Sequence, residues 1–440
     1  EIMPSLVGSE MCIRDSLRSL AQKLYPKGVD AQDGCSNYAE SANKTKQLVK
    51  HRQKIIYNAV FIEDDIAIVI DMLVWKSGAW KAYEIKTGTK VSKGSFIFAA
   101  FKWYALKKAR LFVNEFSFVV LNKSYYRGDV LHFTQCFKRI SSLTEIKKLL
   151  PLAVRKIKES KAILASETEP EVIIGKHCIF PYDCRFKSHC WKDVPETSVL
   201  DIVGLNNEYK FQLYQDGFTK MEDLLDTEET EITEHQEIQI KSQVSGETHI
   251  DKEKIQEFLD TISYPLHFLD FESYQPFLPR EKGMNPLQQC VFQYSLHQQE
   301  TKDSELIHQE FLALPKEKED IRLLFLKSLL KDTAEAKSVL VYDVSFEKYY
   351  LTYLAKFFPK YKVPIQKLMD KMVDLMQPFA QKYIYTPEMK GLHSIKAILP
   401  ALIPAMDYKE LDLQNGLMAS LVYAQWCEGT SEEESEVIEK

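Results

Sequence analysis

The sequence predicts an α/β protein in which two mixed blocks are joined by a helical connector. The first observation is length, because 440 residues exceed one domain of about 100–200 residues. The second is that short apolar runs rich in Val, Ile and Phe alternate with longer amphipathic stretches in both halves of the chain. The third is a charged middle section that lacks such runs. We therefore expect a separate core in each block.

The elements of the first block follow from local patterns. Runs of β-branched and aromatic residues predict strands, and apolar residues at helical spacing predict helices. A break is expected at Pro151, because proline lacks the backbone N–H that a helix interior uses. The strands are expected at residues 55–61, 67–75, 80–86 and 115–121, and the helical stretches at 95–113 and 142–166.

The domain boundaries follow from composition. The first block is expected over 17–195, the connector over 196–262 and the second block over 263–427. Within the connector, polar residues 226–251 are the expected flexible boundary. Residues 1–16 have no regular period and no signal-peptide pattern, and they resemble a translated sequencing adaptor, so we expect a non-native leader. Residues 428–440 form an acidic tail, expected to fray.

Composition limits the function classes. Apolar residues make up 45% and charged residues 27%, which excludes wholesale disorder and fibrous repeats. A net charge of −6 excludes a histone-like polycation and leaves room for a local basic groove. No apolar run approaches the ~20 residues of a membrane span, so no membrane partner is expected. Eight cysteines are too sparse for a disulfide scaffold and favour a cytoplasmic location.

The first candidate site combines two acids and a lysine. Asp71 lies in an apolar strand, and Glu84 and Lys86 are two residues apart in the next strand, on one face. A hairpin would bring Asp71 beside them. Two carboxylates that hold Mg²⁺ or Mn²⁺, with an ammonium that stabilises charge, suit phosphodiester hydrolysis. The alternative is a half-exposed hairpin with ordinary surface charges.

The second candidate site is a loop with three cysteines. Cys178, Cys184 and Cys190 recur at six-residue steps in a stretch rich in Pro and aromatic residues. Such a stretch is a poor helix or strand, so thiolate binding of a metal is the expected cause of its order. The alternative is three free thiols in a loop.

The third candidate site lies in the second block. Asp270 and Glu272 alternate with apolar residues on one strand, so both carboxylates share a face and suit Mg²⁺ or Mn²⁺. Glu347 follows a buried strand and a short turn. Asp374 adds a fourth acid. Alternatively, Glu347 favours a helix dipole and Asp374 is a solvated turn acid.

The first block resembles the RecB-like branch of the PD-(D/E)XK nucleases, which have a restriction-endonuclease-like fold. The resemblance rests on the strand acid, the hairpin, the Glu-Ile-Lys step, the following helix and the cysteine loop. It implies that Lys102 stands where these nucleases usually place a glutamine, and that Lys102 and Tyr104 contact nucleic acid. The alternatives are that Lys102 signals reduced activity and that Tyr104 packs in the core. It also implies a [4Fe–4S] cluster on the loop, with zinc as the alternative. The fourth cysteine would precede the present start, and Cys35 is a weaker substitute.

The second block resembles the DEDD exonucleases, which have an RNase H-like fold. In that family an acid sits in the strand-to-helix turn after an aromatic residue, so the resemblance favours Glu347 over Asp343. The whole set is similar to a bacterial family of unknown function that joins a RecB-like domain to such a domain. DEDD nucleases carry their last acid on a late helix, and no such acid follows Asn415 before the tail. We therefore expect a fragment truncated at both ends.

The leading hypothesis is a metal-dependent nuclease with two candidate centres, acting on DNA in preference to RNA. The alternatives are a nucleic-acid-binding module with one or both centres inactive, and a scaffolding protein. No P-loop is visible, so a helicase or ATPase would be a separate partner. The oligomeric state does not follow from the sequence.

Overall fold

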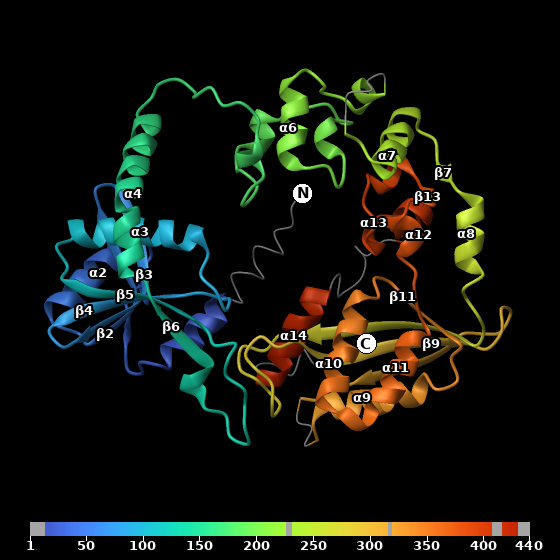
Figure 1. The fold of residues 1–440 in the computed structure, drawn as a ribbon. Helices are drawn as coiled ribbons and strands as arrows, with labels where there is room; N and C mark the ends of the chain where they lie inside the picture. Colours follow the sequence, from blue (N-terminus) through green and yellow to red (C-terminus); the bar gives the residue numbers. More distant parts are fainter. Residues whose placement is uncertain (1–13, 226–230, 316–318, 407–415, 430–440) are drawn as a thin grey trace. The chain divides into compact units, whose positions relative to one another are not determined.

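The computed structural model describes residues 14–225, 231–315, 319–406 and 416–429, and it shows a mixed α/β chain (Figure 1). Most of the expected leader and tail lie outside these residues. Contacts divide the chain into two compact units. Unit 1 comprises Glu1–Pro170 with Gln275–Cys290, and unit 2 comprises Glu171–Tyr274 with Val291–Lys440. None of the described helices combines the length and apolar character needed to cross a membrane.

Unit 1 is built on a six-stranded sheet in chain order. Strands β2, β3 and β4 form an antiparallel meander, after which α3 crosses over to β5, which runs parallel to β4. The four strands predicted from sequence are confirmed. The strands are β1 Val29–Asp30, β2 Ile55–Glu63, β3 Ile66–Lys76, β4 Ala79–Ile85, β5 Val113–Leu121 and β6 Phe137–Ser141.

The described helices of unit 1 include α2 (Tyr38–Lys50), α3 (Lys93–Lys108) and α4 (Leu143–Leu164), with a 3-10 turn, η1 (Phe133–Cys136). Their apolar faces pack on the sheet around Trp103 and Phe118. The break expected at Pro151 is wrong, because α4 continues through it.

Two features of α4 account for its continuity. Pro151 is exposed, so the carbonyl that it leaves without a helical partner is open to water. Ile146, Ala153 and Ile157 on the same helix are buried, and α4 packs along α3. Packing of this apolar face therefore outweighs the loss of one backbone hydrogen bond.

Unit 2 is built on a five-stranded mixed sheet with its first strand at the centre. The order is β10-β9-β8-β11-β12, in which β9 and β10 are antiparallel and β8, β11 and β12 are parallel. A separate pair joins β7 and β13. The strands are β7 His249–Ile250, β8 Leu266–Tyr274, β9 Cys290–Gln299, β10 Ile307–Leu312, β11 Ser338–Val341, β12 Met372–Asp374 and β13 Ile384–Tyr385.

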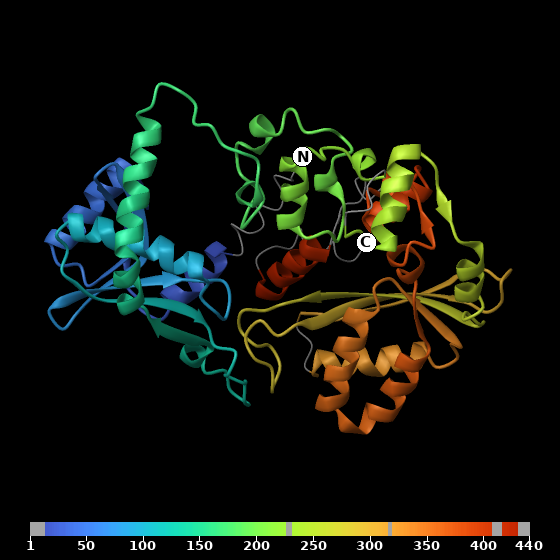
Figure 2. The ribbon, with the colours of Figure 1, turned by 45° about the horizontal axis from the view of Figure 1, so that its top comes forward.

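Within unit 2, helices α9, α10 and α11 cover one face of this sheet and α14 lies on the other (Figure 2). The α helices are α5 Lys187–Cys190, α6 Asn207–Gln215, α7 Glu234–Ser245, α8 Lys252–Leu259, α9 Ile321–Asp332, α10 Ser345–Phe357, α11 Lys362–Asp370, α12 Gln377–Ala380, α13 Ile395–Leu402 and α14 Gly416–Glu428. The 3-10 turns are η2 Lys176–Cys178, η3 Val199–Asp201, η4 Met221–Leu224, η5 Pro359–Tyr361 and η6 Pro387–Met389.

The division between the units differs from the boundary expected at Pro195. Residues 171–195 belong to unit 2 because they contact the helical segment that follows. Lys176 pairs with Glu208 at 2.6 Å, and the Trp191 ring meets Phe211 edge-on.

The polar stretch 226–251, expected as a flexible boundary, is described over residues 231–251. This part contains the ordered helix α7. Thr233 and Gln236 form a capping box at the start of α7, and Gln239 is 1% exposed. The polar composition that suggested a linker belongs to this helix, in which Gln236 and Gln239 are buried and form side-chain hydrogen bonds.

Candidate functional sites

The meander of unit 1 brings Asp71 and Glu84 together. Asp71 lies on β3 and Glu84 on β4, and the two carboxylic acids are only 2% and 3% exposed. The amide of Ile85 donates to Asp71 Oδ2 at 2.7 Å, which fixes the acid against the neighbouring strand. The pairing expected from the hairpin is therefore present in the structure.

Each of these acids meets a cation from another element. Arg18, in the helical segment 14–22, places Nη2 2.7 Å from Asp71 Oδ1. Lys102 on α3 places Nζ 2.5 Å from Glu84 Oε2 and donates to the Val69 carbonyl at 2.7 Å. Arg18 is a site residue that the sequence did not reveal, since nothing in the spacing links it to Asp71.

The electrostatics show that these side chains form one group. Burial raises the pKa of Glu84, and Asp71 raises it further, while Lys102 and Lys86 oppose the rise. Burial lowers the pKa of Lys86, whose ammonium lies 5.5 Å from the centroid of the Phe118 ring. With Arg18, the group holds three basic side chains and two acids.

Two buried carboxylate oxygens of this group lack a hydrogen-bond donor. These atoms are Glu84 Oε1 and Asp71 Oδ1, and the second forms an ion pair with Arg18. A cation or a proton would satisfy such atoms. The charge balance nevertheless does not demand a metal, because the basic side chains already compensate the acids.

A cavity of about 710 Å³ lies beside Lys102. Basic side chains outnumber acidic ones in its lining and are accompanied by aromatic side chains, a combination that suits the backbone and bases of a single strand. Tyr104 does not line it and instead donates to Asp64 at 2.6 Å. Lys102 and Tyr104 are two positions apart on α3 and so lie on different faces. The cavity's charged and aromatic walls are Arg14, Arg18, Lys102, Lys161, Asp15, Asp65, Tyr38, Phe98 and Phe101.

The cysteine loop folds on itself through its backbone. The amide of Cys184 donates to the Cys178 carbonyl at 2.8 Å, and Cys190 ends the short helix α5. Cys178 is buried and the other two thiols are half-buried. Cys35 belongs to unit 1, where its Sγ lies 3.6 Å from the Ala31 carbonyl.

The acids of unit 2 gather at the carboxyl ends of three parallel strands. Asp270 and Glu272 lie in the second half of β8, Asp343 follows β11, and Asp374 ends β12. Because parallel strands end at one edge of a sheet, their acids meet there. Glu347 joins them from the first turn of α10 and is 3% exposed.

Alternation along β8 sets which way its acids face. Leu269 and Phe271 pack into the core under α9 and α10. Tyr274, on the opposite face, contacts Tyr423 of α14 with ring centroids 4.9 Å apart. Asp270 and Glu272 share the face of Tyr274, as the period of two predicts.

Burial and repulsion by neighbouring acids raise the pKa values of Glu272 and Glu347. Burial, then Asp270, raise the pKa of Glu272 to about 7, while Lys396 opposes them. Burial raises the pKa of Glu347 to about 8, with further increases from Asp270, Asp343 and Asp374. Partial loss of hydration also raises the pKa of Asp270. The four predicted acids of this site therefore interact with one another.

The sequence analysis favoured Glu347 over Asp343 as the acid that follows β11. In the structure both side chains belong to the acid cluster. The Asp343 amide donates to Asp374 Oδ1 at 3.0 Å, and its carboxylate accepts from Ser345 Oγ. Its φ of +61° is one that aspartate tolerates better than most residues.

The start of α14 closes against Glu272. A Cβ at Gly416 would lie 3.0 Å from Glu272 Oε2, so the absence of a side chain allows this approach. The helix carries no acid before Glu428. The acids of this site differ from those of unit 1. None of its five carboxylates forms an ion pair within the part of the chain that the structure describes.

The donor sets differ in how well they fit a metal. Among the described residues, no three His, Cys, Asp or Glu side chains converge as a ready ligand set. The thiols of Cys178, Cys184 and Cys190 therefore do not form a ready metal-ligand set in this structure. In unit 2, however, Glu347 Oε2 is buried without a hydrogen-bond partner, and uncompensated hard oxygen donors are what Mg²⁺ and Mn²⁺ prefer.

Comparisons with known proteins match parts of the chain. Residues 267–394 match the model of a domain of unknown function, DUF2779. The chain is also 32% identical over 97 residues to Uncharacterized protein UU173 of Ureaplasma parvum serovar 3 (strain ATCC 700970). That alignment covers 18% of this chain and 14% of the relative. The family segment contains all five acids of the unit 2 site.

Proposed function

We propose that the chain is a metal-dependent nuclease and that the acids of unit 2 form its hydrolytic centre. The observation that carries the proposal is their placement. Five carboxylates from three parallel strands and one helix lie at one sheet edge, and none of them has an ion pair among the described residues. Burial and the neighbouring acids raise the pKa values of Glu272 and Glu347. Such a set is stable in its ionised form only with a cation.

Asp270, Glu272, Glu347, Asp343 and Asp374 are the residues that would hold Mg²⁺ or Mn²⁺. A divalent cation there would supply Lewis-acid activation of a phosphodiester and of water. With a pKa of about 8, Glu347 keeps its proton at neutral pH until a cation replaces it. Hydrolysis therefore depends on both metal and pH.

Topology supports the two fold resemblances. The central position of β8, which carries Asp270 and Glu272, in a mixed five-stranded sheet supports an RNase H-like domain. The meander with Asp71 and Glu84, followed by the α3 crossover to a parallel strand, supports a RecB-like domain.

A second function is favoured for unit 1 by a specific observation. Arg18 and Lys102 already compensate its two acids, and four basic, two acidic and three aromatic side chains line the adjoining cavity. We infer that unit 1 grips nucleic acid, with DNA as the first substrate to test and RNA as the second. In this proposal its own hydrolytic capacity is weaker than that of unit 2.

The metal requirement gives a direct test. Mn²⁺ binding to the full chain is followed by electron paramagnetic resonance, beside Asp270→Asn and Glu84→Gln. We expect Asp270→Asn to lower the affinity for Mn²⁺ at least tenfold and Glu84→Gln to have a smaller effect. Equal binding by all three proteins would refute the assignment to unit 2.

A further inference from the structure

The outer strand of the unit 2 sheet has a free edge. Strand β10 pairs with β9 on one side, and among the described residues no strand pairs with its other side. Residues 307–310 of this strand are exposed, and the Ile307 side chain is 58% exposed. The strand contains no lysine or proline, the residues that commonly keep an edge strand from pairing. An edge with these properties is a template for another strand.

The register with β9 shows which backbone groups of β10 are free. Antiparallel strands alternate between pairs that exchange two hydrogen bonds and pairs that exchange none. The amide of Ala313 donates to the Phe292 carbonyl at 2.8 Å, which continues the register of β10 on β9 and marks a hydrogen-bonded pair. The odd-numbered positions of β10 therefore bond to β9. The N–H and C=O groups of the even-numbered positions, which include His308 and Glu310, point to the free edge.

The sequence of this edge is complementary to itself when it is reversed. Residues 306–312 read Leu-Ile-His-Gln-Glu-Phe-Leu. If a second copy runs antiparallel about a two-fold axis at Gln309, apolar side chains face apolar ones and an imidazole faces a carboxylate on either side of the axis. The pairs that this register makes are Leu306 with Leu312, Ile307 with Phe311, His308 with Glu310, and Gln309 with its own copy.

Charge selects this register among the alternatives. Free backbone groups must face free backbone groups, so the two-fold axis has to pass through a residue and not between two. An axis at Glu310 would place two carboxylates opposite each other, and an axis at His308 would place two imidazoles opposite each other. Larger shifts shorten the overlap of the two strands. An axis at Gln309 therefore gives the best-matched pairing.

Contacts within the subunit hold the pairing side chains in place. The His308 ring stacks on the His297 ring with centroids 4.6 Å apart, and its Nε2 lies 3.2 Å from Ser295 Oγ. The Phe311 ring stacks on Tyr294 with centroids 5.9 Å apart. Side chains that are already ordered lose less conformational entropy when a partner binds.

We propose that a second copy of this chain pairs with β10 in this register, so that two five-stranded sheets join into one continuous sheet. His308 and Glu310 of the two copies exchange backbone hydrogen bonds, and their side chains form an imidazole–carboxylate pair on either side of the axis. A single strand edge is a small contact, so the dimer dissociates on dilution. The inference does not rest on the proposed nuclease function.

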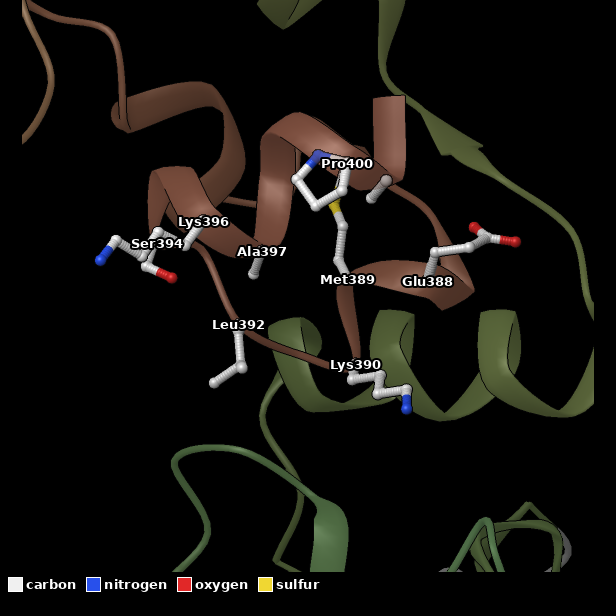
Figure 3. Close-up of a pocket in the computed structure, with 9 residues that line it drawn as sticks. Glu388, Met389, Lys390, Leu392, Ser394, Lys396, Ala397 and Pro400 are labelled. Atoms are coloured by element: carbon white, nitrogen blue, oxygen red, sulfur yellow. The ribbon is translucent and has the colours of Figure 1, made fainter. Parts of the chain in front are cut away.

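This pairing leaves the proposed hydrolytic centre open. The acids lie at the carboxyl ends of β8, β11 and β12, and β9 separates β10 from β8. The pocket of residues 388–401 shown in Figure 3 belongs to the acid end of the sheet, because the Tyr342 hydroxyl after β11 donates to the His393 carbonyl at 2.6 Å. We therefore expect loss of the dimer to leave Mn²⁺ binding unchanged.

Sedimentation velocity of the full chain, over a series of micromolar concentrations, measures the dimer. The unchanged protein should shift from monomer toward dimer as its concentration rises. Glu310→Lys should weaken dimerisation about tenfold or more, because two symmetric pairs lose their attraction and a lysine now occupies the edge. The double variant His308→Glu with Glu310→Lys should recover much of the dimer, because it restores opposite charges in the reverse order.

The matched control is Glu257→Lys on the exposed surface of α8, which makes the same change of charge away from β10 and should dimerise as the unchanged protein does. All of these substitutions are at exposed positions, so folding should be retained.

A cysteine at the proposed axis tests the register. Gln309 would face its own copy in a pair without backbone bonds, where Cα atoms lie about 4.5 Å apart, within reach of a disulfide. With oxidised glutathione as the oxidant, Gln309→Cys should form a covalent dimer above the background of the unchanged protein. Ile307→Cys, which would face Phe311, should stay at that background.

The outcomes separate this proposal from the nuclease proposal. An unchanged protein that stays monomeric throughout, or a dimer that Glu310→Lys does not weaken and Gln309→Cys does not cross-link, would overturn the β10 dimer and leave the metal site untouched. A dimer with the expected behaviour in a protein that neither binds Mn²⁺ nor cleaves nucleic acid would sustain this inference while the nuclease proposal fails.

Discussion

Replacement of Glu347 by glutamine should stabilise unit 2 in the absence of metal. The side chain is 3% exposed, and its pKa rises from the ordinary 4.5 to about 8 because burial and three neighbouring acids disfavour its charge. An acid with a raised folded-state pKa contributes full stability below about pH 4.5 and loses it as the pH rises toward 8. A neutral amide of similar shape avoids that loss.

The magnitude follows from the same shift. Moving the pKa from 4.5 to about 8 corresponds to about 5 kcal/mol, at 1.36 kcal/mol for each pKa unit. Relaxation of the site and entry of water reduce this ceiling, so we expect Glu347→Gln to gain about 1–3 kcal/mol at pH 8. At pH 5 the gain should be only a small part of this, because pH 5 lies just above the ordinary pKa of 4.5 and ionisation of the unfolded chain has cost little stability there.

Hydrogen exchange of the β8 and α10 amides in EDTA, at pH 5 and pH 8, measures this gain within unit 2. The matched control is Glu257→Gln on the exposed surface of α8. Added Mn²⁺ should stabilise the unchanged protein more than Glu347→Gln, which lacks one of the five carboxylates. If amide exchange in Glu347→Gln and Glu257→Gln depends on pH in the same way, the proposal that these acids repel one another and bind a metal is wrong.

Three further changes test other parts of the structure. Lys102→Gln should raise the Mn²⁺ affinity of unit 1 by about tenfold, because an ammonium group no longer competes for the Glu84 carboxylate. The control Lys107→Gln should leave that affinity unchanged, and electron paramagnetic resonance measures both. If the resemblance to iron–sulfur nucleases holds, Cys184→Ser should lower the iron or zinc content of anaerobically purified protein, which elemental analysis would show. Gly391→Ala should cost about 2–4 kcal/mol in urea unfolding through strain and overlap, against about 1 kcal/mol for Gly246→Ala, which has open space.

Local sequence patterns predicted what depends on strand periodicity. Alternation along β3 and β4 brings Asp71 and Glu84 together, and alternation along β8 places Asp270 and Glu272 on one face. These contacts follow from a period of two and short connections, which a single sequence reveals.

Tertiary contacts decided the remaining features. Arg18 reaches Asp71 from a distant helical segment, and no spacing rule connects them. The boundary at Pro170 and the course of α4 through Pro151 depend on packing partners elsewhere in each unit. Asp343 enters the acid cluster through a left-handed backbone conformation, which the neighbouring sequence permits but does not demand.

The most direct measurement is cleavage of end-labelled single-stranded DNA and RNA with Mn²⁺ by the full-length protein, beside Asp270→Asn and Glu84→Gln. The account predicts that Asp270→Asn lowers the rate at least a hundredfold, while Glu84→Gln keeps a tenth or more of it. Unchanged cleavage by Asp270→Asn would contradict the claim that unit 2 is the hydrolytic centre.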